Sequence, residues 1–408
     1  MYCFPVFKMI YLFLVFLMFK TLVNSEAAKI LVIIPTPSIS HQMVFRPLTQ
    51  GLASRGHEVT VITTDPAFPK GQAPPNLTEI DVHDISYTTW QNELRKVSVG
   101  DKTDMVAQLE MFVNLQAKIF QEQVLNKKVQ DQLKVKTHFD LILTEAYSRP
   151  ALIYSHIYKA PLIQVSSAGT TVGTNEIIGT PNHPILYPST FSQRLYNLSL
   201  WEKIITIYEQ VSFERMHVFK EEEENIMLRK IFGPDIPTLS ELKKNVHMVF
   251  LNMHPIWYDN QPMPPSVVFM GGLHQKPEKE LPQVIKLVNN TQVSSKQNIK
   301  IGSNGAYVWF TGHPKLKLFV TQGGLQSTDE AITAGVPLIG IPVIVDQWYN
   351  TEKYVQHGIG IQLRINTFTE DDFKRNNSAK ICFFCLPPKF HWTRSSKVAI
   401  ALLECWTN

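Results

Sequence analysis

The sequence of 408 residues has few cysteines and little excess of charge of either sign. Its four cysteines, Cys3, Cys382, Cys385 and Cys405, are too few to form a disulfide framework. Lys and Arg number 39 against 35 Asp and Glu, and the net charge of +4 does not indicate a nucleic-acid partner. Hydrophobic residues at 44% and charged residues at 18% exclude a disordered or coiled-coil chain. We therefore expect a globular protein, long enough for two domains of ~100–200 residues each.

Long apolar runs are also scarce, and the clearest one lies at the N-terminus. Residues 9–19 are continuously apolar, follow Lys8 and precede small residues near Ser25, which predicts a cleaved secretory signal peptide over residues 1–25. An uncleaved anchor is the alternative, although the run is shorter than the ~20 residues that span a bilayer. We expect the mature chain in the secretory pathway, either in the endoplasmic reticulum lumen or secreted. The N-glycosylation candidates in that compartment are Asn76, Asn197, Asn289 and Asn376.

The residues after the signal alternate between strand and helix patterns. Continuous apolar runs predict strands at 29–34, 58–63, 140–144 and 161–166, and apolar residues at helical spacing predict helices at 43–55, 104–133, 150–159 and 204–231. The segment 104–133 is long enough for one or two helices. This alternation predicts an α/β domain with a doubly wound parallel sheet over residues 26–254.

A proline-rich segment separates this pattern from a second one. Residues 255–282 hold six prolines, so we expect an irregular connection between domains. A strand at 316–321, a helix at 324–334 and a strand at 336–344 then indicate a second α/β domain over 283–368. Residues 369–408 show no clear period, and we expect them to form an irregular tail.

Polar residues at the carboxyl ends of the predicted strands are the first candidates for a ligand site. His41 follows the strand at 29–34 and would begin the next helix, whose dipole keeps a histidine neutral, as a general base requires. A hydrogen bond to a loop carbonyl is the alternative role for this histidine.

A carboxylate for this histidine is predicted from the same sheet. Glu145 follows the strand at 140–144, and neighbouring parallel strands could bring it to His41, where it would orient the ring. An ion pair at a strand end is the alternative. Asp140 competes for this role, but it starts its strand and should therefore lie at the opposite edge of the sheet.

Two adjacent glycines lie where a later strand leads into a helix. Gly323 and Gly324 would let backbone N–H groups approach a phosphate at the helix N-terminus, and Glu330 could accept bonds from ribose hydroxyls. Any tight strand–helix connection can also use such a turn. Asp346 and Gln347, beyond the next strand, supply a carboxylate and an amide suited to a polyhydroxylated group.

These residues closely resemble the signature of the UDP-glycosyltransferase family. In the C-terminal half the resemblance is carried by His313-Pro314, FVTQGG at 319–324, Ser327, Glu330-Ala331, GVP at 335–337, Pro342, Asp346-Gln347 and Asn350. In the N-terminal half, Ser40-His41, GLASRGHEVT at 51–60, FDLI at 139–142 and GGLH at 271–274 are similar to insect or animal members. The resemblance extends from about residue 29 to residue 366.

The resemblance implies a GT-B-like fold, in which two Rossmann-like doubly wound domains face a cleft. The N-terminal domain would hold a small lipophilic acceptor and the C-terminal domain a UDP-sugar. It implies that His41 deprotonates the acceptor hydroxyl, which displaces UDP with inversion, and that Glu145 orients His41. No metal or other cofactor is implied. The residues that it places around the UDP-sugar are Gly302, Ser303, His313, Gln322, Gly323, Gly324, Ser327, Glu330, Asp346 and Gln347.

The chain departs from the family pattern mainly in its second half. Gln322 stands where the family usually has His, which removes a charge from the phosphate site. The family's Trp-x-Pro-Gln element, whose Trp stacks on uracil, is not found. The loop at Gly302-Ser303 runs within ten residues into His313, so we expect an incomplete second domain that has lost a strand and one or two helices. The family's C-terminal membrane anchor is not recognised after residue 368.

The predicted function is therefore an inverting transfer of a hexose, glucose by resemblance to insect members, from a UDP-sugar to a lipophilic hydroxyl compound. The alternative is a catalytically silent or truncated relative that at most binds lipophilic small molecules.

Overall fold

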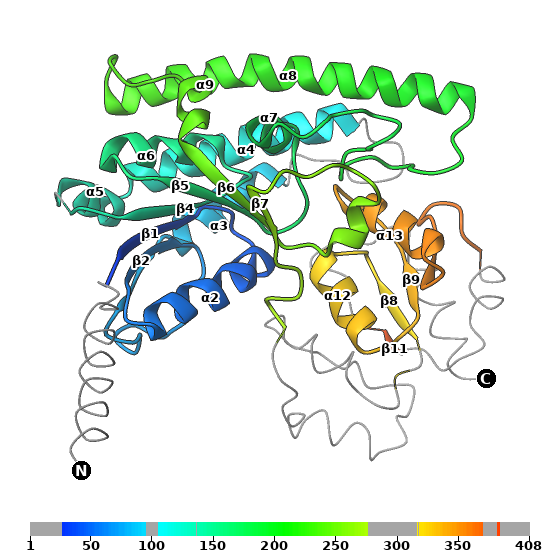
Figure 1. Cartoon of the computed structure of the whole chain (residues 1–408), viewed down its shortest axis with the longest axis horizontal. Coiled ribbons are helices and arrows are strands. Elements are labelled where there is room, and N and C mark those ends of the chain that lie inside the picture. The colour runs from blue at the N-terminus through cyan, green and yellow to red at the C-terminus, as the bar shows by residue number, and fades with distance from the viewer. Residues whose placement is uncertain are drawn as a thin grey trace, which may run out of the picture.

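A seven-stranded parallel sheet organises the first part of the chain. The computed structural model describes residues 27–94, 105–135, 137–275, 316, 318–369 and 382–383. The strands are β1 (Lys29–Ile34), β2 (Glu58–Thr63), β3 (Leu77–Asp81), β4 (Leu141–Glu145), β5 (Leu162–Ser166), β6 (Val246–Leu251) and β7 (Val267–Phe269). Their order is β3-β2-β1-β4-β5-β6-β7, and it reverses between β1 and β4 (Figure 1). This order is that of a doubly wound dinucleotide-binding fold.

The sheet is buried on both faces, which explains why its strands are continuously apolar. In β1, Leu31 and Ile33 pack into the core on one face, whereas Val32 and its even-numbered neighbours pack into the core on the other. The helices of this part are α2 (Ile39–Ser54), α3 (His83–Leu94), α4 (Met105–Leu125), α5 (Lys127–Lys134), α6 (Ile153–Tyr158), α7 (Val172–Ile178), α8 (Leu200–Phe232) and α9 (Leu239–Leu242). Parallel strands need such covering helices because each crossover crosses one face of the sheet.

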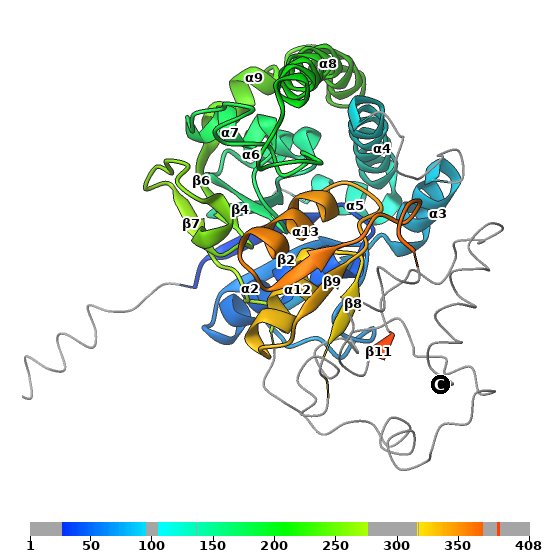
Figure 2. The same cartoon turned by 90° about the vertical axis from the view of Figure 1, so that its right-hand side faces the viewer.

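A second, smaller parallel sheet follows. Its strands are β8 (Phe319–Thr321), β9 (Leu338–Gly340), β10 (Gly360–Gln362) and β11 (Cys382–Phe383), in the order β10-β9-β8-β11. The helices α12 (Leu325–Thr333) and α13 (Gln347–Gln356) belong to this unit, which lies against the first domain (Figure 2).

The two units share one apolar cluster. Trp257 and Tyr258, in a short 3-10 helix at Pro255–Tyr258, pack with Phe319, Leu325 and Tyr349 of the second unit. The Tyr349 hydroxyl donates a hydrogen bond of 2.5 Å to the Trp257 carbonyl. The joint between the two parts of the chain is therefore a packed core, and it fixes the helices of the second unit against the first sheet.

Two boundaries predicted from sequence are corrected by the strand pairing. The predicted connection at 255–282 contains β7, which pairs in parallel with β6, so the first domain extends beyond residue 254. Prolines are tolerated there because β7 is an edge strand. The predicted irregular tail at 369–408 contains β11, which pairs with β8 in the second sheet. Such long-range pairing leaves no local periodicity to detect.

Other expectations are confirmed with small shifts. The strands predicted at 29–34 and 58–63 are found at those residues, and segment 104–133 forms the two helices α4 and α5. Helix α2 begins at Ile39, earlier than the predicted residue 43, and β4 includes Glu145. The signal peptide predicted at residues 1–25 lies outside the described residues, as do residues 283–315 of the second domain predicted at 283–368.

Candidate active site

His41 and Glu145 meet where the strand order of the first sheet reverses. Strands β1 and β4 are parallel neighbours, with Ile33 opposite Thr144, so the residues that follow β1 lie beside the end of β4. His41 Nδ1 is hydrogen-bonded to the Glu145 Oε1 atom, and Glu145 is fully buried. The other carboxylate oxygen accepts a 3.1 Å hydrogen bond from the Thr36 backbone N–H. Glu145 is therefore fixed at both oxygens and orients the histidine.

The position of His41 follows from the start of α2. Ser38 is the N-cap residue of the helix, with extended backbone angles, and His41 lies in the first turn. The imidazole is partly accessible, with 21% of its side chain exposed, whereas the side chain of its carboxylate partner has no exposed surface. Because Nδ1 is engaged, Nε2 is the ring nitrogen that can accept a proton from a bound molecule.

Sequence reasoning missed two residues beside the histidine. The Ser167 hydroxyl lies 2.9 Å from His41 Nδ1, and the Tyr147 ring lies 5.6 Å from the imidazole, centroid to centroid. Ser167 follows strand β5, so the strand-end rule that found Glu145 applies to it as well. Asp140, the alternative partner, instead accepts a 2.7 Å hydrogen bond from the Lys29 backbone N–H at the opposite edge of the sheet.

An apolar cluster lies next to this pair. Tyr147 packs against a group of buried side chains from α4, α8, α13 and the loop before α8, namely Met105, Leu109, Phe191, Phe213 and Trp348. The Phe112 ring meets the Tyr147 ring edge to face at 6.0 Å. The surroundings of the histidine on this side therefore suit a lipophilic group.

The second unit presents the N-terminus of α12. Gly324 is the N-cap residue of this helix, and a Cβ atom built there would meet only the Gln322 amide, at 3.8 Å. Gly323 has φ +92°, and its Cβ would lie 2.6 Å from the Thr351 methyl group. The turn thus requires glycine at position 323. At position 324 the absence of a side chain leaves the backbone N–H groups of the helix N-terminus accessible to a phosphate. Ser327 lies in the first turn of the same helix.

Buried acidic groups follow on α12. Glu330 is 7% exposed, and its Oε2 atom has no hydrogen-bond partner among the described residues. Burial, together with the neighbouring Asp329, raises the pKa of Glu330 to about 8. His274, from the loop after β7, approaches Glu330 Oε1 to 3.8 Å. A buried carboxylate oxygen without a partner is suited to accept a hydrogen bond from a ligand hydroxyl.

Asp346 is the N-cap residue of α13, and its carboxyl group interacts electrostatically with His41. Burial raises the pKa of Asp346 to about 6, while the hydrogen bond from Asn350 and the nearby His41 act in the opposite direction. The Asn350 amide, at 3.0 Å from Asp346 Oδ2, also donates a 2.9 Å hydrogen bond to the Gly323 carbonyl. Asn350 therefore connects the carboxylate of Asp346 to the glycine turn of the same unit.

Gln347 has a structural role in the turn before α13. Its Oε1 atom accepts hydrogen bonds from the backbone N–H groups of Val343, at 2.9 Å, and Ile344, at 3.1 Å. Val345, which follows Ile344, has φ +55°, which is unfavourable for a β-branched residue. The amide nitrogen of Gln347 is the part of this side chain that remains for a ligand.

The two units are in direct contact beside the histidine. The Gln326 side-chain amide, in the first turn of α12, lies 3.4 Å from the backbone oxygens of both Ser40 and Ser167. The sequence-predicted residues that the structure brings together are therefore His41, Glu145 and Asp346, with the 322–327 turn beside them. Gly302, Ser303 and His313 lie outside the described residues, and their predicted roles stay predictions.

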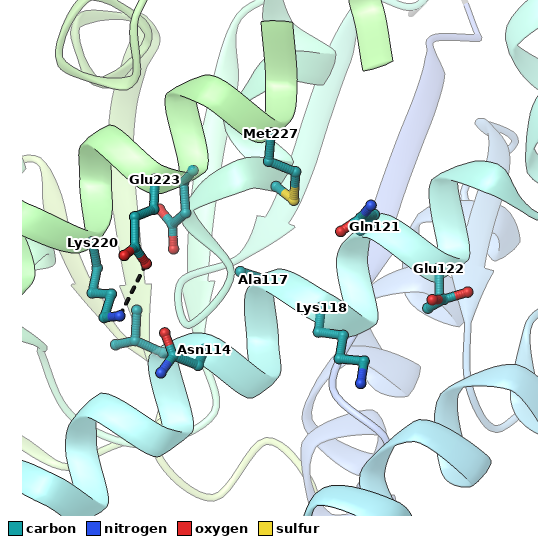
Figure 3. Close-up of a pocket in the computed structure, with 10 residues that line it drawn as sticks. Asn114, Ala117, Lys118, Gln121, Glu122, Lys220, Glu223 and Met227 are labelled. Carbon is teal, nitrogen blue, oxygen red and sulfur yellow. Dashed lines mark hydrogen bonds and ion pairs between the residues drawn. The ribbon is translucent and has the colours of Figure 1, made fainter. Parts of the chain in front are cut away.

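A cavity lies away from these residues, between α4 and α8. Its volume is about 350 Å³, and Figure 3 shows Lys220 and Met227 of α8 opposite Asn114 and Lys118 of α4. Lys118 pairs with Glu93 at 2.7 Å, and Lys220 pairs with Glu223 at 2.9 Å and with Glu110 at 3.2 Å. Because its lysines are already paired, this cavity is a poorer candidate for an anionic donor.

The described residues contain neither a metal-binding cluster nor a membrane-spanning helix. No group of three or more His, Cys, Asp or Glu side chains that could hold a metal ion is found among them. Within the same residues, no helix is both long enough and apolar enough to cross a membrane.

Comparison with known proteins agrees with the geometry. A family profile described as UDP-glucoronosyl and UDP-glucosyl transferase matches residues 28–311 and 306–381. The chain belongs to this family. As a UDP-glycosyltransferase, it is 30% identical over 409 residues to the ecdysteroid UDP-glucosyltransferase of Lymantria dispar multicapsid nuclear polyhedrosis virus, covering 86% of this chain and 80% of the relative. It is 27% identical over 417 residues to UDP-glucosyltransferase 2 of Dactylopius coccus, covering 88% and 78%.

A solved structure confirms the fold class. The glycosyltransferase of kitacinnamycin superposes with a TM-score of 0.51 at 15% identity, covering 94% of both chains. The UDP-glycosyltransferase described here is thus a GT-B enzyme with two doubly wound α/β units. The two matched segments of the family profile overlap at residues 306–311, between Gly302 and His313 in the sequence.

Proposed function

We propose that this UDP-glycosyltransferase transfers glucose from UDP-glucose to a hydroxyl group of a small lipophilic acceptor, with inversion at the anomeric carbon. The observation that carries the proposal is the His41–Glu145 pair, which faces Asp346 and the N-terminus of α12 from the other unit. The relatives named as UDP-glucosyltransferases support glucose as the sugar. The apolar cluster around Tyr147 supports a lipophilic acceptor, and the viral relatives are named for ecdysteroids.

The proposed reaction is one displacement. The acceptor hydroxyl gives its proton to His41 Nε2 while its oxygen attacks the anomeric carbon from the face opposite UDP. The bond between that carbon and the phosphate oxygen breaks, and UDP leaves with the bonding electrons. Glu145, hydrogen-bonded to Nδ1, stabilises the imidazolium that forms.

The donor is proposed to lie along the second unit. Its diphosphate would meet the backbone at Gly324 and the dipole of α12, which stabilises negative charge. The unpartnered Oε2 of Glu330 would accept a ribose hydroxyl, and Asp346 would accept hydroxyls of the sugar. This arrangement sets the anomeric carbon between Asp346 and His41.

We also propose that the chain matures in the secretory pathway. Asn76 and Asn197 are both exposed, so a glycan could be attached at either residue without displacing the core. Digestion with peptide N-glycosidase should increase the electrophoretic mobility of the protein made in eukaryotic cells. Unchanged mobility of the digested protein, in gels that resolve a single glycan, would contradict this proposal.

The test of the activity combines donor binding with product formation. UDP-glucose should raise the melting temperature in a concentration-dependent manner, because a ligand that binds only the native state stabilises it. UDP-glucuronic acid is the matched control donor. Incubation with labelled UDP-glucose and a panel of hydroxylated lipophiles, an ecdysteroid among them, should give a labelled glucoside. Binding of lipophiles without glucoside formation would favour the catalytically silent alternative.

A further inference from the structure

The apolar cluster beside His41 contains a buried polar atom that has no partner. Trp348, in the first turn of α13, is 3% exposed and packs in this cluster with Met105 and Phe213. Its indole Nε1 atom has no hydrogen-bond partner among the described residues. An indole N–H can only donate, and in a protein interior it usually finds an acceptor. The unpaired N–H of Trp348 therefore needs an explanation.

Packing alone does not account for the indole nitrogen. A phenylalanine also packs well in an apolar joint, whereas burying an N–H group without an acceptor is costly. An ordered water is a poor substitute, because it needs two or more polar partners and the buried members of the cluster are apolar side chains. An oxygen atom of a bound molecule that accepts the hydrogen bond would recover this cost. The unpaired donor therefore indicates a ligand.

Helix α4 presents a second polar atom of this kind. Gln108 is 6% exposed, and its Oε1 atom has no hydrogen-bond partner among the described residues. It lies on the buried face of α4 that also carries Met105 and Leu109, two members of the apolar cluster. The amide oxygen is an acceptor, and the buried members of the cluster carry no charge. A matching ligand is therefore apolar, with neutral oxygen groups and no carboxylate or ammonium group.

The cluster is connected to the histidine by one aromatic ring. Tyr147 packs against the cluster, and its ring lies 5.6 Å from the His41 imidazole, centroid to centroid. Met105 and Met216 belong to the same cluster, and their unbranched thioether chains can shift to admit a ligand. A molecule whose hydroxyl group reaches His41 would extend along Tyr147 toward Trp348.

We propose that Trp348 determines acceptor specificity by donating a hydrogen bond from Nε1 to a carbonyl oxygen of the acceptor, away from the hydroxyl that reacts at His41. This inference rests on the proposed function, which places the reacting hydroxyl at His41. The acceptor class is then an apolar skeleton with a remote ketone or lactone, in preference to a simple apolar alcohol. Asp346, proposed to bind the sugar, lies two residues before Trp348, so one turn of α13 would contact both substrates. Gln108 Oε1 is available to a further hydroxyl group of the acceptor.

A matched pair of probes tests the proposal on the full protein as eukaryotic cells produce it. Umbelliferone and β-naphthol are fused bicyclic phenols of similar shape, and only umbelliferone has a ring carbonyl away from its hydroxyl group. The test variant is Trp348→Phe, which keeps an aromatic ring and removes the donor. The control variant is Trp90→Phe; the half-buried Trp90 ring meets the Phe112 ring edge to face at 6.5 Å, outside the buried cluster. Equilibrium dialysis at saturating UDP gives the dissociation constants of both probes for each protein.

We expect Trp348→Phe to lower the preference for umbelliferone over β-naphthol by about tenfold, through weaker binding of umbelliferone, and Trp90→Phe to leave the preference unchanged. Other differences between the two probes cancel in this comparison, because they are the same in every protein. If Trp348→Phe does not fold, the infrared carbonyl band of umbelliferone bound to the wild type decides. A hydrogen bond shifts this band to a lower frequency than in an apolar solvent.

An equal preference in all three proteins, an unshifted carbonyl band, or a wild type that binds neither probe would overturn the inference. The proposed function fails in a different way. If no glucoside forms from UDP-glucose and umbelliferone while the binding preference still depends on Trp348, the transfer reaction is contradicted and the role of the indole N–H is not.

Discussion

His41 and Glu145 are 104 residues apart in the sequence and share a hydrogen bond in the structure. The bond exists because β1 and β4 are neighbours at the point where the order of the sheet reverses, so that the loop after β1 and the end of β4 face one another. Thr36, at the beginning of the same loop, holds the other oxygen of the carboxylate. One topological feature therefore places both the proposed base and the residue that orients it.

Glu145→Gln is expected to reduce kcat by about 10²-fold or more and to change KM little, because the amide keeps the shape but cannot stabilise an imidazolium. Glu145→Asp should recover much of the loss, since it restores the carboxylate. Steady-state kinetics at saturating UDP-glucose measure both effects. A variant that raises KM and leaves kcat unchanged would show that Glu145 acts on binding and not on the orientation of His41.

The two glycines of the 322–327 turn should respond differently to alanine. Gly323→Ala is expected to lower the free energy of unfolding by about 3 kcal/mol, because φ is +92° and its Cβ would meet the Thr351 methyl group at 2.6 Å. Gly324→Ala should cost less than about 1 kcal/mol but weaken UDP binding. Gly335→Ala, where φ is +66° and no atom lies within 4 Å, is the control for backbone strain alone. Urea unfolding measures the free energy of unfolding of the three variants. Equal losses in all three would contradict the different roles assigned to Gly323 and Gly324.

UDP binding is expected to release a proton and to strengthen with pH. Burial and Asp329 raise the pKa of Glu330 to about 8, so its carboxyl is protonated in the free protein below that pH. A ribose hydroxyl donates to the ionised form, and affinity should therefore rise from about pH 6 to about pH 8. Calorimetry in buffers of different ionisation enthalpy measures the proton, and Glu330→Gln should abolish its release.

The same groups predict how stability depends on pH. The pKa of Asp329 is raised to about 7 by burial, and the pKa of Glu330 is raised as well. At pH values above the ordinary pKa of a carboxyl group, the native state therefore binds more protons than the unfolded state. The free energy of unfolding should fall as pH rises from about pH 5 to about pH 8, and Asp329→Asn with Glu330→Gln should flatten this slope. A stability that rises over this range would contradict the assignment.

Gln322→His should tighten the binding of UDP by severalfold. Gln322 lies next to the glycine turn, where its amide can donate a hydrogen bond to a phosphate but carries no charge. A histidine, protonated beside the diphosphate, would add a charge-assisted bond. Thermal-shift titration with UDP measures the change, and Gln326→His, one turn away, is the control. Weaker binding by Gln322→His would indicate that this residue does not face the phosphate.

Much of the first domain could be predicted from the sequence, because buried parallel strands leave continuous apolar runs. The strand-end rule also located His41 and Glu145 without knowledge of the strand order. The rule was applied too narrowly, since Ser167 satisfies it at the end of β5 and lies 2.9 Å from the histidine. Tyr147 could not be found this way, because its role depends on ring packing with Phe112 and not on its place in a strand.

The second unit was harder to predict for physical reasons. Strand β11 is only two residues long and is defined by its pairing with β8, which no local pattern records. Helix α13 begins directly after Asp346, whereas the sequence placed this residue only beyond the preceding strand. The Gln347 side-chain oxygen accepts hydrogen bonds from the backbone N–H groups of Val343 and Ile344. These bonds likewise depend on the folded turn and leave no pattern in the sequence. The strand ends and the family resemblance indicated the candidate residues, and packing decides which of their atoms remain for a ligand.

The most direct test of the central claim is the rate of glucosyl transfer by His41→Ala, measured beside its binding of UDP. The hydrogen bonds of the His41 ring go to Glu145 and Ser167, which belong to the first domain and not to the glycine turn, so UDP affinity should stay within about twofold of wild type. Transfer from UDP-glucose should fall by about 10²–10⁴-fold. Transfer at the wild-type rate, with UDP binding intact, would show that another group removes the acceptor proton and would contradict the account.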